Sequence, residues 1–128
     1  MTKLVLDSSA WIEYFTGTPK GAKVRDLMKN NEIYTSSISL AEISSKFKRS
    51  KKDPKEASDI VLSNSKIVNT DNELSVNAGI LHADVRLTTP KFSLSDAYML
   101  LTARNLKAKV VTWDYDFKEF KETIFLDG

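Results

Sequence analysis

The chain has 128 residues, 41% of them hydrophobic and 28% charged, with a formal net charge of +2, which is typical of one globular domain over residues 1–128. The lack of cysteine excludes disulfides, thiolate zinc sites and a cysteine nucleophile, and the single histidine excludes mechanisms that need two. The apolar runs are too short to span a bilayer, and Asp7 interrupts the first of them, so we expect a cytoplasmic protein without a signal peptide.

Short apolar runs alternate with helical patterns along the chain. Strands are predicted over residues 3–6, 33–35, 66–68, 109–112 and 124–126, the last of them at a sheet edge. Helical patterns begin near residues 8, 19, 39, 54, 70 and 93. Several of these starts have the form of a capped first turn with an acid near its third position, and these acids are Glu42, Glu56, Glu73 and Asp96.

This alternation predicts an α/β protein in three layers, with helices on both faces of a central, mainly parallel sheet of four to five strands. One connection is difficult to explain. Two consecutive helices separate the strands at 66–68 and 109–112, so the loop around Pro90 must return the chain to the starting edge if these strands are parallel. The sequence does not show how this happens.

Acidic residues gather where the predicted strands end. Asp7 and Asp114 each follow a strand, and Asp116 lies two residues further on. Glu42 and Asp96 are expected in the first turns of helices that begin at the same carboxyl edge. Because ligands of open α/β sheets bind at this edge, we expect five carboxylates from four segments at one rim.

A structural role is the alternative for each acid taken singly. Glu42 and Asp96 fit the third position of a capping box, as Glu56 and Glu73 do, and we assign the last two to capping only. Asp7 also fits a turn that follows a strand. Asp114 and Asp116, in the segment TWDYDF, fit turn or N-cap positions in the same way.

Five converging carboxylates would raise one another's pKa values unless a cation offset their charge. Without cysteine, the cation that suits such a site is hard and oxygen-loving, Mg²⁺ or Mn²⁺. One or two such ions can activate water and stabilise the leaving oxygen in phosphodiester hydrolysis.

The chain resembles the PIN-domain ribonucleases and is most similar to the VapC-type toxins of prokaryotic toxin–antitoxin pairs. The resemblance covers nearly the whole chain and rests on four segments in a fixed order: LVLDSSAWI (4–12), SSISLAEI (36–43), SLSDAYMLLTA (93–103) and VVTWDYDF (110–117). It implies a PIN-like fold, Mg²⁺- or Mn²⁺-dependent endonucleolytic cleavage of RNA, a homodimer and often a small antitoxin that blocks the site.

The resemblance also implies roles for individual residues. The catalytic acids are Asp7, Glu42, Asp96 and Asp114, and Asp116 is an auxiliary acid. On this basis we expect Asp7, Asp96 and Asp114 to hold the metal directly, while Glu42 and Asp116 bind through water or tune the site. Ser9 and Thr112 match the small hydroxyl positions that orient these acids. Trp113 departs from the polar residue that is usual before the fourth acid; it either stacks on a base or fills the rim.

A basic stretch, residues 46–55, holds six cationic side chains. Such a run is usually a solvated helix end, but an acidic nuclease site also needs cations nearby to hold the phosphates of RNA. The expected RNA contacts are Lys48, Arg49, Lys51 and Lys52, together with Trp113.

Two other functions are compatible with the sequence. A binding module of the same fold for RNA or protein, without cleavage, is the main alternative, and the complete set of acids argues against it. A phosphotransfer domain with Asp7 as acceptor would need a second acid beside Asp7, where the chain has Ser8 and Ser9.

Overall fold

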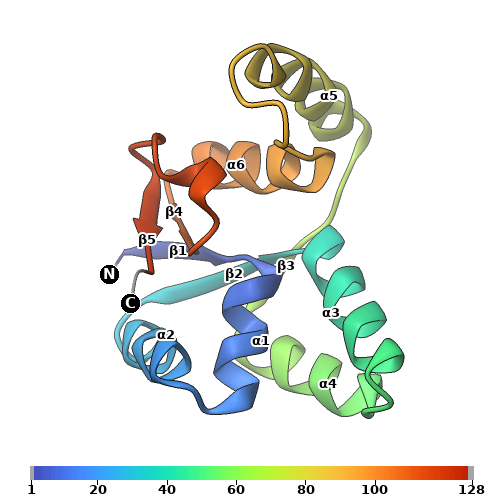
Figure 1. Cartoon of the computed structure of the whole chain (residues 1–128), viewed down its shortest axis with the longest axis vertical. Helices are drawn as coiled ribbons and strands as arrows, with labels where there is room; N and C mark the ends of the chain where they lie inside the picture. The colour runs from blue at the N-terminus through green and yellow to red at the C-terminus, as the bar shows by residue number, and fades with distance from the viewer. Residues whose placement is uncertain (1, 127–128) are drawn as a thin grey trace.

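The computed structural model describes residues 2–126 and shows a five-stranded sheet between two layers of helices (Figure 1). The strands are β1 (Lys3–Leu6), β2 (Glu32–Ser36), β3 (Lys66–Val68), β4 (Lys109–Thr112) and β5 (Thr123–Phe125). The helices are α1 (Ser8–Thr16), α2 (Pro19–Lys29), α3 (Ser37–Arg49), α4 (Pro54–Asn64), α5 (Asn72–Arg86) and α6 (Leu94–Leu106), with one 3₁₀ turn, η1 (Tyr115–Phe117).

The sheet is parallel throughout its described strands, in the order β3-β2-β1-β4-β5. The expected three-layer α/β architecture is therefore confirmed, and "mainly parallel" becomes fully parallel. The central strand β1 carries Leu4, Val5 and Leu6, each at most 1% exposed. Such a continuous apolar run is what a strand covered by helices on both faces requires.

The two faces of the sheet have separate cores. Leu4 and Leu6 point to one face and pack with residues of α1, α2, α3 and α4, including the fully buried Trp11. Val5 points to the other face and packs with residues of α5 and α6. In Figure 1, α6 lies directly on the sheet and α5 lies outside it. Alternate side chains of one strand thus divide the helices between the layers.

Each of the first three crossovers contains two helices that pack against each other: α1 with α2, α3 with α4, and α5 with α6. The chain turns between α5 and α6 through a segment in which the backbone N–H of Thr89 donates to the Val85 carbonyl and that of Phe92 to the Thr89 carbonyl. Phe92 is 1% exposed, which anchors this turn in the core. The turn around Pro90 therefore returns the chain so that β4 can lie parallel to β1.

Two predicted helix starts were wrong. Helix α3 begins at Ser37 behind the N-cap Ser36, so Glu42 lies in its second turn and not in a capping box with Ser39. Helix α5 has Asp71 as its N-cap, and not Thr70. In both places a run of neighbouring cap-forming residues offered several starts, and tertiary packing selected one. The last strand also begins and ends one residue earlier than predicted.

Among residues 2–126, no helix combines the length and the apolar character that crossing a membrane requires.

Helices α1 and α2 approach closely at Gly21. A Cβ at this position would lie 2.1 Å from the Glu13 carbonyl oxygen, whereas a Cβ at Gly79 in α5 would meet no atom within 4 Å. Gly21→Ala should therefore lower the free energy of unfolding by about 1–3 kcal/mol. Gly79→Ala should raise it by about 0.5–1 kcal/mol, because alanine favours helix. Urea denaturation of both variants measures this; a shift in the same direction for both would contradict the packing described.

Candidate metal centre

Four of the expected acids line one cavity at the carboxyl edge of the sheet. Asp7 directly follows β1, Asp114 follows β4 by two residues, Asp96 lies in the first turn of α6, and Glu42 reaches the rim from α3. The cavity has a volume of about 490 Å³, and all four carboxylates contribute to its wall. The structure thus brings together acids from four separate segments of the chain.

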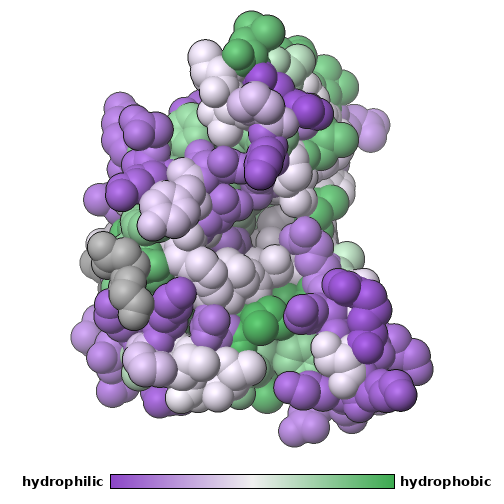
Figure 2. Space-filling view, in the orientation of Figure 1, coloured by the Kyte–Doolittle hydropathy of each residue, from purple (hydrophilic) through white to green (hydrophobic). Residues whose placement is uncertain are grey.

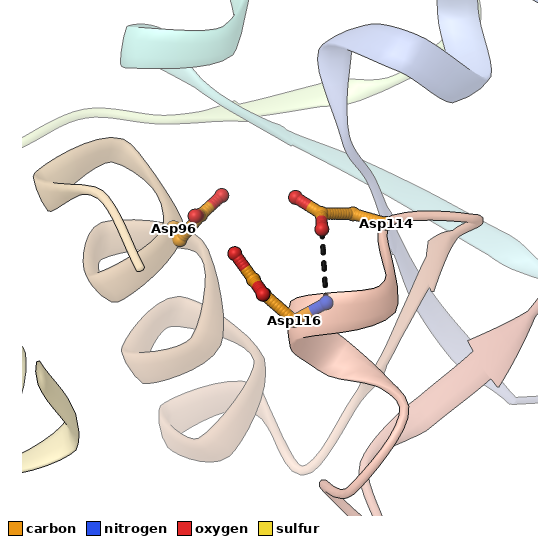
Figure 3. A group of neighbouring side chains, drawn as sticks. All are labelled: Asp96, Asp114 and Asp116. Carbon is orange, nitrogen blue, oxygen red and sulfur yellow. Dashed lines mark hydrogen bonds between the residues drawn. The ribbon is translucent and has the colours of Figure 1, made fainter. Parts of the chain in front are cut away.

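The tightest cluster within this group is Asp96, Asp114 and Asp116. One carboxylate oxygen from each of these residues lies within 4.8 Å of the other two. Figure 3 shows the three side chains pointing toward one another, with the Asp116 backbone N–H donating to Asp114 Oδ1 over 2.9 Å. Asp116, expected as an auxiliary acid, therefore belongs to the same cluster as Asp96 and Asp114.

Asp7 lies beside this cluster, and its carboxylate is held by the protein. The side chain is 7% exposed. Its Oδ1 accepts from the Ser9 hydroxyl and the Ala10 backbone N–H, both at 2.7 Å, and its Oδ2 accepts from the Thr112 hydroxyl at 2.5 Å. Asp7 is thus the N-cap of α1 and also a link between β1 and β4.

Thr112 connects two of the acids. While its hydroxyl donates to Asp7, the same oxygen accepts from the Asp114 backbone N–H at 3.0 Å. The residue is fully buried at the end of β4, so its side chain has little freedom to turn away. The structure therefore places Thr112 and Ser9 in contact with Asp7, where the resemblance expects small hydroxyl residues.

Asp96 and Glu42 differ in how far capping explains them. Asp96 closes a capping box: its Oδ2 accepts from the Ser93 backbone N–H, and the Ser93 hydroxyl accepts from the Asp96 N–H. Its carboxylate nevertheless also belongs to the three-acid cluster. Glu42 lies beyond the first turn of α3 and caps nothing. Capping therefore accounts for part of Asp96 and for none of Glu42, whose carboxylate is instead hydrogen-bonded to the side chains of Ser95 and Ser8.

Burial makes these acids hard to ionise. Loss of water raises the pKa of Asp7 to about 6, against the lowering effect of the Thr112, Ser9 and Ala10 hydrogen bonds, and the charge of Asp114 raises it further. Loss of water also raises the pKa of Glu42 and of Asp96, with nearby carboxylates adding to both shifts. A cation in the cavity would relieve this cost.

The donor set fits a hard divalent cation. The cluster offers carboxylate oxygens and no sulfur or imidazole, the ligands that Mg²⁺ and Mn²⁺ accept. Asp96, Asp114 and Asp116 are close enough to share one ion. Direct coordination by Asp7, as expected from the sequence, stays a prediction.

The cavity also includes polar residues that the sequence interpretation did not single out. Hydroxyls of Ser8, Ser39 and Ser95 line its wall, and Lys91 adds a cation. The serines sit beside the motif acids in sequence, which was a usable signal. Nothing in the sequence distinguishes Lys91 from other exposed lysines.

The basic stretch lies at the end of α3 and in the loop that follows. Lys48, Arg49, Lys51 and Lys52 are all exposed. Trp113 is half-buried and lines the acidic cavity, with the Lys20 ammonium 5.1 Å from the centre of its ring. Of these four cationic residues, Arg49 lines another cavity, whose wall also includes Trp113.

A comparison with protein-family models decides the family. The model of the PIN domain matches residues 4–123. The chain belongs to the PIN domain family. The resemblance stated from the sequence is thereby confirmed, and the fold with it.

The PIN fold is shared with solved toxin–antitoxin structures. The chain is similar to a chain of the VapBC2 complex from Rickettsia felis, solved with a DNA fragment from its promoter, at 24% identity, TM-score 0.76 and 97% coverage of both chains. It is similar to a chain of a toxin–antitoxin complex from Klebsiella pneumoniae, at 19% identity, TM-score 0.74 and coverage of 97% and 98%. No curated protein sequence matches the chain.

A third structure carries an activity in its name. It is VapC20 of Mycobacterium tuberculosis, described as a toxin that cleaves the sarcin–ricin loop. The chain is similar to this PIN-fold protein at 17% identity and a TM-score of 0.70, with coverage of 93% of this chain and 97% of that one. At such identities the comparison establishes the shared fold.

The raised pKa of Asp7 gives a test of its environment. Folding shifts this pKa from 3.8 to about 6, so ionising Asp7 lowers the free energy of unfolding as pH rises between these values. The free energy of unfolding of Asp7→Asn, taken relative to that of the wild type, should therefore increase by about 2–3 kcal/mol from pH 3.5 to pH 7.5. Denaturant unfolding of chelator-treated protein measures this, with Glu56→Gln as a matched surface control. An equal difference at both pH values would contradict the assigned burial of charge.

Proposed function

We propose that this PIN-domain protein is a metal-dependent endoribonuclease, the toxin of a toxin–antitoxin pair. The observation that carries the proposal is the cluster of Asp96, Asp114 and Asp116 within 4.8 Å, of which Asp96 and Asp114 line a cavity together with Asp7 and Glu42. An acidic site with oxygen ligands alone suits metal-assisted hydrolysis of phosphodiesters and needs no protein nucleophile. The name of VapC20 supports RNA as the substrate.

In this proposal the protein's own groups divide the work. Asp96, Asp114 and Asp116 hold a Mg²⁺ or Mn²⁺ ion, and Asp7 completes the set from the buried side. When bound, the ion supplies charge compensation at the phosphate and activation of water. Thr112 keeps Asp7 and the Asp114 backbone in fixed relation, and Glu42, with its raised pKa, lies at the rim where it can accept a proton or bind through water.

A small antitoxin is the proposed partner, since the Rickettsia felis and Klebsiella pneumoniae structures are named as toxin–antitoxin assemblies. A separate cavity of about 410 Å³ lies between α1, α3 and α4. Phe15, Phe47, Ala57 and Ile60 form its apolar wall beside the charged Lys52, Asp53 and Glu56, which supports a partner segment there. In Figure 2, hydrophobic side chains gather over these helices. The homodimer and the cytoplasmic location stay predictions from the sequence.

The phosphotransfer alternative fits poorly. Asp7 would have to be open to a phosphate donor and to have a second acid beside it. Its side chain is only 7% exposed, and Ser8 and Ser9 follow it in the sequence. The non-cleaving binding module remains the alternative that a cleavage assay decides.

Cleavage of defined single-stranded RNAs in Mg²⁺ or Mn²⁺ tests the proposed activity. Asp96→Asn and Asp116→Asn should each lower kcat/KM by at least about a hundredfold, because each removes a charge that the ion requires. Glu56→Gln, a first-turn acid of α4 outside the cavity, should leave it within about twofold. A wild-type protein that binds RNA without cutting it would favour the binding module, and activity that survives both aspartate changes would refute the assigned site.

The basic stretch is tested by salt dependence. Replacing Lys48, Arg49, Lys51 and Lys52 with serine should flatten the plot of log K against log salt for RNA binding by about 0.7 for each lost phosphate contact. Filter binding between 50 and 200 mM salt measures this slope. If the slope of the fourfold variant equals that of the wild type, these residues have no part in RNA binding.

A further inference from the structure

A second cavity adjoins the acidic one. It has a volume of about 400 Å³ and shares Ser8, Ser9, Glu42 and Trp113 with the cavity that holds the acids. Its remaining walls come from α1 and α3, and they are Ile12, Ser45, Lys46 and Arg49. The shared residues make the two cavities neighbouring parts of one recess.

We propose that this second cavity is a subsite for one unpaired nucleotide of the RNA, next to the phosphate that is cut. The inference rests on the proposed function, because the acids define where the reacting phosphate lies. It adds a place for base recognition outside the metal cluster and assigns Ile12, Lys46, Arg49 and Trp113 to it.

The aromatic wall suits a nucleobase. Trp113 is half-buried, so its ring is fixed by packing while part of it faces the cavity. Ile12 adds an apolar surface from α1. Stacking on an aromatic ring is the commonest way in which proteins hold unpaired bases, and it tolerates any base. The Lys20 ammonium, 5.1 Å from the centre of the Trp113 ring, adds positive charge beside it.

The cationic wall suits the phosphates of the same strand. Glu42, Ser45, Lys46 and Arg49 are spaced i, i+3, i+4 and i+7, so they share one face of α3. Glu42 lies at the end near the acids, Lys46 is one turn further along and Arg49 two turns. Arg49 Nε donates to the Ser45 hydroxyl at 3.3 Å, which orients the guanidinium along this face. The recess therefore changes from acidic at the metal cluster to cationic at its far end.

Size and charge together select the occupant. A cavity of about 400 Å³ is at the small end of the range for ligand pockets and suits one nucleotide. A base inside a duplex is stacked and paired on both sides, and only an unstacked base can insert its face against an indole. Cations beside an aromatic ring favour a nucleotide over a basic or neutral peptide.

Fluorescence gives a test that does not depend on cleavage. Trp11 is fully buried and its Nε1 donates to Thr35, so an added ligand reaches Trp113 alone of the two tryptophans. A six-nucleotide single-stranded RNA, added in chelator to prevent cutting, should quench the wild-type emission, while the same RNA annealed to its complement should not. Lys46→Ser with Arg49→Ser should weaken this binding by about tenfold.

A charge-matched control separates the cavity from general electrostatics. Lys109 and Lys121 are exposed near the amino ends of β4 and β5, at the opposite edge of the sheet. Lys109→Ser with Lys121→Ser removes the same charge and should leave the quench unchanged. Equal weakening by both pairs would overturn the subsite.

Kinetics give the second test. Trp113→Leu should raise KM for single-stranded RNA by about tenfold with little change in kcat, and Trp113→Phe should restore most of the loss. Ser45→Phe, which fills the cavity without removing a contact group of the base, should also raise KM. A normal KM in both Trp113→Leu and Ser45→Phe, with folding verified by circular dichroism, would overturn the subsite.

The two proposals fail in different ways. Quenching by RNA in a protein that never cleaves it would leave the subsite standing and refute the nuclease. Cleavage of RNA with an unchanged KM in every subsite variant would leave the nuclease standing and refute the subsite. Quenching by a peptide of the antitoxin type, and not by single-stranded RNA, would overturn the proposal in favour of a protein partner.

Discussion

The buried carboxylate of Asp7 joins the elements on which the site depends. One oxygen caps α1 and the other accepts from Thr112 at the end of β4, so a single side chain ties the two central strands and the first helix together. Hydrogen bonds to a charged group contribute about 1.5–3 kcal/mol each, yet burial still holds the pKa at about 6. The fold therefore supports the acid's position while disfavouring its charge.

The fold also holds the neighbouring acids Asp96 and Asp114 in place through local interactions. Asp96 lies in the first turn of α6, where the positive end of the helix dipole and the Ser93 N–H stabilise a carboxylate. Asp114 caps η1 through the Asp116 N–H. Each acid thus has a local reason for its position that does not depend on an ion. Because these anchors act independently, the cluster forms without an ion, and an ion that bound there would not need to order the chain.

Most of the fold was predictable because its signals are local. The apolar run before Asp7, the caps at Thr18, Asp53 and Ser93, and the alternation of short strands with helical patterns each gave the correct element. The starts of α3 and α5 were not, since adjacent serines, or threonine beside aspartate, cap a helix almost equally well. The turn at Pro90 depends on Phe92 entering the core, a long-range contact that no local pattern shows.

The sequence was enough to predict which acids form the site, but less so how their side chains are arranged. Strand ends and helix starts place Asp7, Asp96 and Asp114 at one edge. The 3₁₀ turn that brings a carboxylate oxygen of Asp116 within 4.8 Å of Asp96 follows instead from how TWDYDF packs around the buried Phe117. Glu42 illustrates the converse. The alternative role of Glu42 in capping rested on a helix start that the structure moved. What remains is its place at the rim, where its carboxylate is hydrogen-bonded to Ser95 and Ser8 and lies near Asp96. An acid that stabilises no helix, loses water and faces other carboxylates weakens the fold, and such a cost is what a binding site for a cation makes tolerable.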